Sequence, residues 1–255
     1  MKRVFSDNDL KNLLEEKYLQ YNNTNFIDSD PIQIPHRFTK KEDIEISAFL
    51  TSIISWGNRK MIINNADKMM KIMGDSPHDF IINSSERNIN SISFVHRTFN
   101  SDDFKFFIMS LKNIYLNHGG LENTFSPKKD DQWIFDSITR FKNIFFSIDH
   151  LKRTKKHISD PAKRSACKRI NMFLRWMVRK DLYGVDFGIW NNILPSILSC
   201  PLDTHTLRIS KELNLISRSQ NDIKTLIQLD EKLRYFDPID PVKYDYALFG
   251  LGVDK

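Results

Sequence analysis

Cysteine, glycine and proline are scarce in this chain, and each shortage excludes a class of protein. Among 255 residues there are two cysteines, eight glycines and nine prolines. Two thiols cannot build a four-cysteine iron–sulfur or zinc site, and so few turn-forming residues argue against an all-β barrel. The longest apolar runs are far short of a membrane span, and no signal peptide is evident. We therefore expect a cytoplasmic protein with no membrane partner.

Hydrophobic residues, by contrast, are plentiful. They make up 40% of the chain, and aromatic residues make up 12%, mostly as 19 phenylalanines. This content is enough for a packed core rather than a disordered chain. Apolar residues recur at helical spacing in several segments, and no segment shows the alternation typical of a strand. The sequence predicts an all-α fold.

The expected helices are separated by short breaks. Thr39 and Glu42 have the spacing of a capping box at the start of the second helix, which Trp56 ends. Gly119 and Gly120 open a polar loop that runs to Asp131. The predicted helices cover residues 7–21, 39–55, 60–73, 104–115, 133–148, 165–180, 203–213 and 222–233, followed by a final apolar segment at 246–250.

The positive charge is concentrated in one segment. The formal net charge is +6, but residues 151–180 contain eleven Lys or Arg and one acidic residue, Asp160. Within this segment, Lys168, Met172, Arg175 and Arg179 share one face of a predicted helix whose other face is apolar. A basic face of this kind is typical of a protein that binds a phosphate backbone, although a solvated surface helix has the same pattern.

Lys168 and Asp203 are the candidate catalytic residues. Asp203 follows Pro201 and Leu202 at the start of a predicted helix, where an aspartate is a favoured N-cap for structural reasons alone. A carboxylate held there also stabilises positive charge on a nearby sugar. Lys168 either contacts phosphate or, if its neighbours and partial burial lower its pKa, attacks carbon as an amine. The residues alone leave both alternatives open.

Three motifs resemble the helix–hairpin–helix superfamily of DNA glycosylases. The segment Pro201-Leu202-Asp203-Thr204-His205 is similar to the helix start that carries the catalytic aspartate of that superfamily. Residues 45–60 and 74–80 resemble its first core helix with the following turn and its next, proline-led step. The resemblance covers roughly residues 40–250 and is nearest to the archaeal 8-oxoguanine branch. Residues 165–179 and 241–252 also resemble segments of an uncharacterised bacterial family.

The resemblance implies a fold, a substrate and a mechanism. It implies two helical lobes with a central cleft, formed by a domain over residues 41–255 after an N-terminal helix and loop at 1–40. It implies base-excision repair of damaged duplex DNA in the nucleoid, with 8-oxoguanine as the favoured lesion. Lys168 would attack C1′ and permit strand cleavage as a lyase, while Asp203 would stabilise charge. No cofactor and no metal are expected, and the protein is expected to be a monomer.

The chain departs from the superfamily pattern in two places. The usual hairpin contains glycines that let backbone amides approach a phosphate, whereas residues 159–166 contain none. Phosphate binding would then depend on Lys163, Arg164 and Ser165. The alignment also permits Arg169 in the nucleophile position, and arginine cannot act as an amine nucleophile. In that case Asp203 would activate water in a monofunctional glycosylase, or the protein would not be a glycosylase.

Further candidates and two rival functions complete the prediction. Trp56 and Trp176 are candidates for stacking on an extruded base, although tryptophan in a helical protein is more often core. Further DNA contacts are expected from Asn58, Arg59, Arg169 and Arg175. One rival is a non-catalytic nucleic-acid-binding protein on the same scaffold. The other is a helical interaction protein whose basic face meets an acidic partner.

Overall fold

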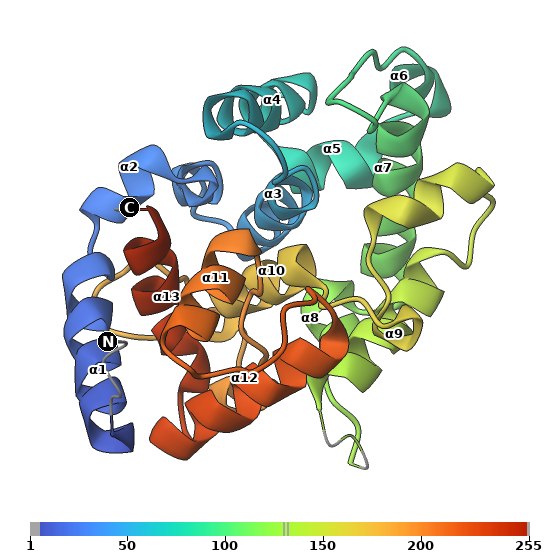
Figure 1. Cartoon of the computed structure of the whole chain (residues 1–255). Helices are drawn as coiled ribbons and strands as arrows, with labels where there is room; N and C mark the ends of the chain where they lie inside the picture. The colour runs from blue at the N-terminus through green and yellow to red at the C-terminus, as the bar shows by residue number, and fades with distance from the viewer. Residues whose placement is uncertain (1–5, 130, 132, 254–255) are drawn as a thin grey trace. The chain divides into compact units, whose positions relative to one another are not determined.

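The computed structural model describes residues 6–129, 131 and 133–253, and these residues form helices and connecting loops (Figure 1). Within those ranges no β-strand is present, and a single isolated bridge pairs His96 with Phe99. The all-α prediction is confirmed. None of the helices in the described ranges combines the length and apolar character needed to cross a bilayer.

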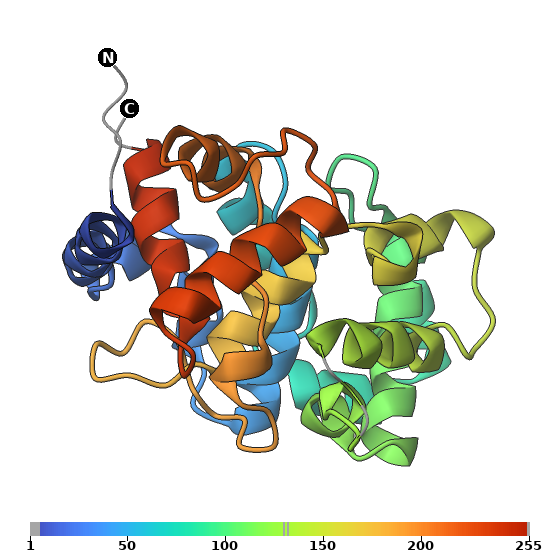
Figure 2. The same cartoon turned by 60° about the horizontal axis from the view of Figure 1, so that its bottom comes forward.

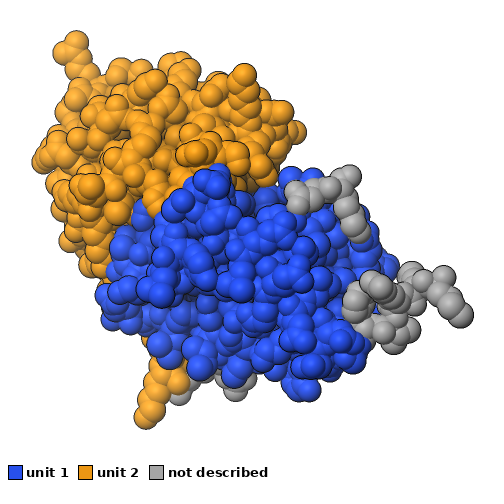
Figure 3. Space-filling view, turned by 90° about the vertical axis from the view of Figure 1, so that its left-hand side faces the viewer, with its two compact units in different colours: residues 1–26, 160–255 blue, residues 27–159 orange. Residues whose placement is uncertain are grey.

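Contacts divide the chain into two compact units (Figure 3). One unit contains residues 1–26 and 160–255, and the other contains residues 27–159. This differs from the predicted division at residue 40, because the opening helix belongs with the C-terminal part of the chain. Residues 1–5 of the predicted N-terminal segment, and positions 130, 132, 254 and 255 of the predicted domain, lie outside the described residues.

The discontinuous unit is built around a pair of helices from distant parts of the sequence. Helix α1 begins after Ser6, whose side chain and that of Asp9 form a capping box. It packs beside α13, as the views in Figure 1 and Figure 2 agree. The helices of this unit are α1 (Asp7–Tyr21), α10 (Lys168–Val178), α11 (Thr204–Glu212), α12 (Ile223–Phe236) and α13 (Tyr244–Val253), with 3-10 turns η4 (Pro161–Lys163), η5 (Pro195–Ile197) and η6 (Pro241–Lys243).

Gly250 explains the close approach of these two helices. A β-carbon at position 250 of α13 would collide with the ring of Tyr21 at the end of α1. Tyr18, one turn earlier, also lies against the α13 residue Tyr246, with ring centroids 6.4 Å apart. Only glycine leaves room for an aromatic ring at this contact.

The unit formed by residues 27–159 has its own aromatic core. Phe49 of α3 packs against Phe145 of α9 at 5.6 Å between ring centroids, and Phe107 of α7 packs against the same ring at 4.8 Å. The unit contains η1 (Pro31–Gln33), η2 (Pro35–Arg37), α3 (Lys41–Ile53), α4 (Arg59–Ile72), α5 (Pro77–Asn83), α6 (Glu86–Asn90), α7 (Ser101–Asn117), α8 (Gly120–Phe125), α9 (Ile134–Phe145) and η3 (Lys152–His157). The boundary between the units falls within α2 (Asn25–Ser29).

The predicted capping box at Thr39 is wrong. Helix α3 begins at Lys41, its N-cap is Lys40, and no side chain bonds to its free amides. The preceding turn η2 continues to Arg37 with Phe38 after it, which leaves Thr39 one residue too early to cap the helix. The carboxylate of Asp43 in the first turn accepts instead from the backbone N–H of His78 at 2.8 Å.

Candidate functional site

In the turn before α10, residues other than glycine adopt a backbone conformation that glycine usually provides. Arg164 and Cys167 adopt left-handed conformations, with φ of 65° and 48°. Each left-handed non-glycine residue costs roughly 1–2 kcal/mol. The Asp160 side chain accepts from the backbone N–H of Ala162 at 3.0 Å, and the Arg164 carbonyl accepts from that of Ile223 at 3.1 Å. These bonds fix the turn against the start of α12.

Helix α10 starts in this turn without a side-chain cap. Its N-cap is Cys167, which makes no capping hydrogen bond. Lys163 and Arg164 are exposed just before it, and the Ser165 hydroxyl accepts from the Cys167 N–H at 3.2 Å. Cationic side chains therefore sit at the positive end of the helix, an arrangement that favours anions.

Lys168 is the first residue of α10 and is partly exposed. Its Nζ lies 3.5 Å from the Sδ of Met172, one turn along the same face. Arg175, a further turn along, continues this stripe into the protein. Lys168 is therefore the partly exposed end of this stripe, and Arg175 lies in its buried part.

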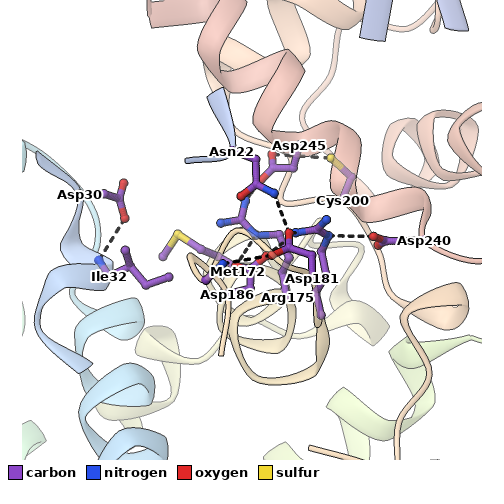
Figure 4. A network of polar contacts seen from close by, with 12 residues as sticks. Asn22, Asp30, Ile32, Met172, Arg175, Asp181, Asp186, Cys200, Asp240 and Asp245 are labelled. Carbon is purple, nitrogen blue, oxygen red and sulfur yellow. Dashed lines mark hydrogen bonds and ion pairs between the residues drawn. The ribbon is translucent and has the colours of Figure 1, made fainter. Parts of the chain in front are cut away.

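Arg175 and Arg179 are buried ion-pair partners, which argues against the predicted contact of Arg175 with DNA. Their exposed fractions are 4% and 0%. Arg175 pairs with Asp186 at 3.2 Å and with Asp245 (Figure 4). Arg179 pairs with Asp181 at 2.6 Å, with Asp240 at 2.9 Å and with Asp186 at 3.1 Å. A buried guanidinium needs such partners to offset its lost hydration, so neither group is available to DNA.

The carboxylates also control the charge of Arg179. Burial acts to lower the pKa of Arg179, but Asp186 and Asp240 more than offset this and raise the pKa above its ordinary value. The guanidinium lies 5.1 Å from the Tyr18 ring centroid, and that of Arg175 lies 4.3 Å from the Tyr246 centroid. This network links α10 to both α1 and α13 and is structural.

Trp176 is part of the core, which argues against its predicted role in base stacking. It is 1% exposed and lies in the buried stretch of α10. Trp190, 2% exposed, packs edge-on against Phe173 with ring centroids 5.3 Å apart. Trp56 is partly exposed and lies in the other unit.

Asp203 is the N-cap of α11, as its position in the sequence predicts. Its Oδ1 accepts from the backbone N–H groups of His205 at 2.8 Å and Thr206 at 2.9 Å. Its Oδ2 receives no hydrogen bond from a described residue and the side chain is partly exposed. The cap thus fixes one oxygen and leaves the other available.

Asp245 is a buried carboxyl of α13 that contacts Arg175 and Cys200. It is 5% exposed on α13, and Cys200, three residues before Asp203, has its Sγ 3.8 Å from the Asp245 Oδ1. Burial raises the pKa of Asp245 to about 6, against the opposing charge of Arg175; the Asp203 carboxylate adds to the rise and the Lys168 ammonium opposes it.

Asp245 was missed at the level of sequence, although a signal was present. It lies in the apolar run Tyr244–Leu248, where an acidic residue is costly unless it is paired. An acid in such a run predicts a buried cation elsewhere, and Arg175 is that cation.

Arg169 occupies a different face of α10 from the Lys168 stripe. Burial lowers the pKa of Arg169 to about 10, an effect that Cys167 opposes. Arg169 therefore remains a cation at neutral pH. Lys168 lies on the face that continues to Met172 and Arg175.

Asn58 and Arg59 begin α4 in the unit of residues 27–159. The Asn58 side chain accepts from the backbone N–H of Met61 at 3.2 Å and is exposed, while Arg59 is partly exposed. Among the residues that the structure describes, no group of three or more His, Cys, Asp or Glu side chains is arranged to hold a metal ion.

Comparison with known proteins gives a family but no activity. A family model described as a protein of unknown function (DUF2400) matches residues 30–254. No curated protein and no solved structure matches the chain.

Proposed function

The chain belongs to the DUF2400 family, whose function is unknown, and from its own residues we propose a DNA base-excision glycosylase with lyase activity. Two observations support the proposal: Lys168 is the partly exposed first residue of α10, and Asp203 caps α11 through Oδ1 with a partly exposed side chain. An amine nucleophile and a carboxylate are the groups that displacement at a sugar carbon requires.

Lys168 acts as the nucleophile in this proposal. Its neutral amine forms a bond to C1′ of the damaged nucleotide as the glycosidic bond breaks, and the electron pair leaves with the base, which takes up a proton. Loss of the amine proton and opening of the sugar ring then give a Schiff base. β-Elimination from this intermediate expels the 3′ phosphate and cuts the strand.

Asp203 stabilises the positive charge that develops on the sugar as the base departs. Its Oδ2 is suited to this role because the α11 amides hold Oδ1 and so fix the direction of the carboxylate. Asp245, with a pKa of about 6, is a second carboxyl able to exchange a proton near neutral pH.

The α10 turn supplies the phosphate contact. Lys163, Arg164 and Ser165 surround the uncapped helix start, and Arg164 holds the left-handed geometry that lets backbone amides approach an anion. The proposed partner is damaged duplex DNA in the nucleoid, bound by a monomer without cofactor or metal. Preference for 8-oxoguanine derives from the superfamily resemblance.

Borohydride trapping tests the mechanism. An 8-oxoguanine duplex mixed with the protein and borohydride should give a covalent adduct, because reduction fixes the Schiff base. Lys168→Gln should abolish the adduct, and Asp203→Asn should slow its formation roughly 100-fold or more.

Lys163→Gln is the matched control, since it removes a neighbouring exposed lysine that is not the proposed nucleophile. It should weaken DNA binding but preserve the adduct at saturating protein. An undiminished adduct with Lys168→Gln, or none with the wild-type protein, removes the lysine mechanism.

A non-catalytic nucleic-acid-binding protein is the second candidate, favoured by the exposed Lys163 and Arg164 at the helix start. Such a protein would bind duplex DNA with a steep salt dependence and leave every glycosidic bond intact. Under this alternative, Asp203→Asn would leave affinity nearly unchanged.

A further inference from the structure

Three loops of the unit formed by residues 27–159 meet at one place. They are residues 56–60, 96–100 and 152–157. The Trp56 ring lies edge-on to His96 with centroids 4.9 Å apart, and stacks on His157 at 6.2 Å. The Arg97 guanidinium lies so close to Gly57 that a β-carbon there would collide with it. The loops therefore form one continuous patch, called here the three-loop surface.

The buried carboxylate of Asp103 joins two of these loops. Asp103 is fully buried, and its Oδ2 accepts from the Asn100 N–H at 3.0 Å and from Nη1 of Arg153 at 2.8 Å. Its Oδ1 accepts from the Thr154 hydroxyl at 2.7 Å, and Nε2 of His157 lies 3.1 Å from Oδ2. Arg153 also donates to the carbonyl of Thr98 at 2.8 Å. The basic segment is thus held to Asp103 and to the 96–100 loop by these four polar contacts.

Asp103 is suited to this role because it stays ionised. Burial acts to raise its pKa, but the hydrogen bonds from Asn100 and Thr154, with the nearby His157 and Arg153, lower the pKa below its ordinary value. The negative charge therefore persists at neutral pH and fixes η3 in position.

The three-loop surface carries positive charge that the protein does not neutralise. The loops contain seven Lys or Arg and no acidic residue. Six of these cations are exposed, and within the described chain five of the six pair with no carboxylate: Lys60, Arg97, Lys152, Lys155 and Lys156. In contrast, Arg37, Arg140 and Arg218 elsewhere in the molecule are each paired.

We propose that the three-loop surface binds the phosphate backbone of duplex DNA. Because Asp103 fixes the backbone of residues 152–157, that backbone has little entropy to lose when its lysines meet phosphates. Partly exposed Trp56 lies beside His96 and His157 as an aromatic contact. The proposal rests on the proposed function for its choice of partner. It adds Arg97, Lys152, Lys155 and Lys156 as DNA contacts on residues 27–159, with Asp103 as the residue that positions their loops.

Salt dependence of binding to an undamaged duplex tests this proposal. The double variant Lys155→Gln/Lys156→Gln should weaken binding at low salt and lower the slope of log affinity against log salt by about two, since each lost phosphate contact removes about 0.9. Arg97→Gln should lower the slope by about one. The control Lys128→Gln/Lys129→Gln removes two adjacent exposed lysines of the same unit and should leave the slope unchanged.

Equal slopes for the two double variants would overturn the proposal, because the effect would then reflect net charge alone. Undetectable duplex binding by the wild-type protein would also overturn it and would favour an acidic protein partner. An undamaged duplex contains no lesion, so the measurement does not depend on base excision. If the slopes change as expected while borohydride trapping gives no adduct, the surface stands and the glycosylase proposal fails.

Discussion

Asp230 is a buried carboxyl whose environment favours its protonated form. It is 2% exposed, its Oδ1 accepts from the Cys200 N–H at 2.9 Å, and Nη1 of Arg234 lies 3.9 Å from Oδ2. Burial raises the pKa of Asp230 to about 7, and Arg234 only partly opposes this. The side chain is therefore a site where folding takes up a proton.

Asp230 should make the protein less stable as the pH rises. Between about pH 4 and 7 the folded chain keeps a proton that the unfolded chain has released, so stability falls across this window, by roughly 4 kcal/mol at most for a shift of about three units. Asp230→Asn should remove this part of the dependence. Urea unfolding measured between pH 4 and 8 provides the check.

Asp222→Asn is the control for that experiment. A backbone hydrogen bond from Thr225 is the main cause that lowers the pKa of Asp222, so its contribution is present above about pH 4 and is lost only in more acidic solution. The variant should lose a constant amount of stability from pH 5 to 8. A pH profile of Asp230→Asn parallel to that of the wild type would contradict the prediction.

Which charged residues are buried could not be predicted from the sequence. The spacing of Lys168, Met172, Arg175 and Arg179 correctly places them on one helical face, but spacing does not show what covers that face. Two of the covering acids, Asp240 and Asp245, lie 61 and 70 residues from their arginine partners, beyond the reach of any local pattern. Asp203, whose N-cap role depends only on its own helix, was predictable.

At the scale of elements, the contact of α1 with α13 depends on the absence of a β-carbon at Gly250. Gly250→Ala should gain about 1 kcal/mol of helix propensity but lose more through collision with Tyr21, for a net loss of about 1–3 kcal/mol. Thermal denaturation followed by circular dichroism measures this loss.

Gly184→Ala provides a comparison for that change. Gly184 has φ of 73° with open space around it, so alanine there adds only backbone strain of about 1 kcal/mol. A neutral or stabilising Gly250→Ala would show that Tyr21 does not pack against α13.

Helix boundaries were predictable where capping and periodicity are local. The predicted helix over residues 7–21 matches α1, and that over 203–213 lies within a residue of α11. The α8 helix was not foreseen, because Gly119 and Gly120 indicate a loop. Both glycines do take positive φ, at 73° and 87°, yet α8 starts at the second of them. The apolar contacts of Leu121 and Phe125, which are fully buried, override the local preference.

At the scale of the whole molecule, the two units should respond separately to damage in their cores. Leu14 of α1 is fully buried in the discontinuous unit, and Leu111 of α7 is fully buried in the other. Leu14→Ala and Leu111→Ala delete the same atoms, and each should cost about 2–5 kcal/mol. Hydrogen exchange read by mass spectrometry should show faster exchange mainly over residues 160–255 for the first variant and over 27–159 for the second.

Each of these two variants is the control for the other. If either change speeds exchange equally along the whole chain, the units unfold together as one cooperative block.

The positive charge of residues 151–180 is not confined to one of the two units. The basic run from 151 to 180 reads as one segment, but the unit boundary after Ser159 divides it between two bodies. Its first part belongs to the three-loop surface, and its second part forms the α10 turn and the buried arginine network. The central cleft implied by the superfamily resemblance stays a prediction.

The pairing of α1 with α13 also limits when the discontinuous unit can fold during translation. Residues 7–21 emerge early, yet the helix that covers their apolar side is made more than two hundred residues later. Residues 27–159 are synthesised well before then and can fold before α13 is available to pack against α1. A nascent chain stalled before Tyr244 would therefore contain a folded unit of residues 27–159 and an α1 helix whose apolar side is exposed. Holdase chaperones are suited to bind such a state.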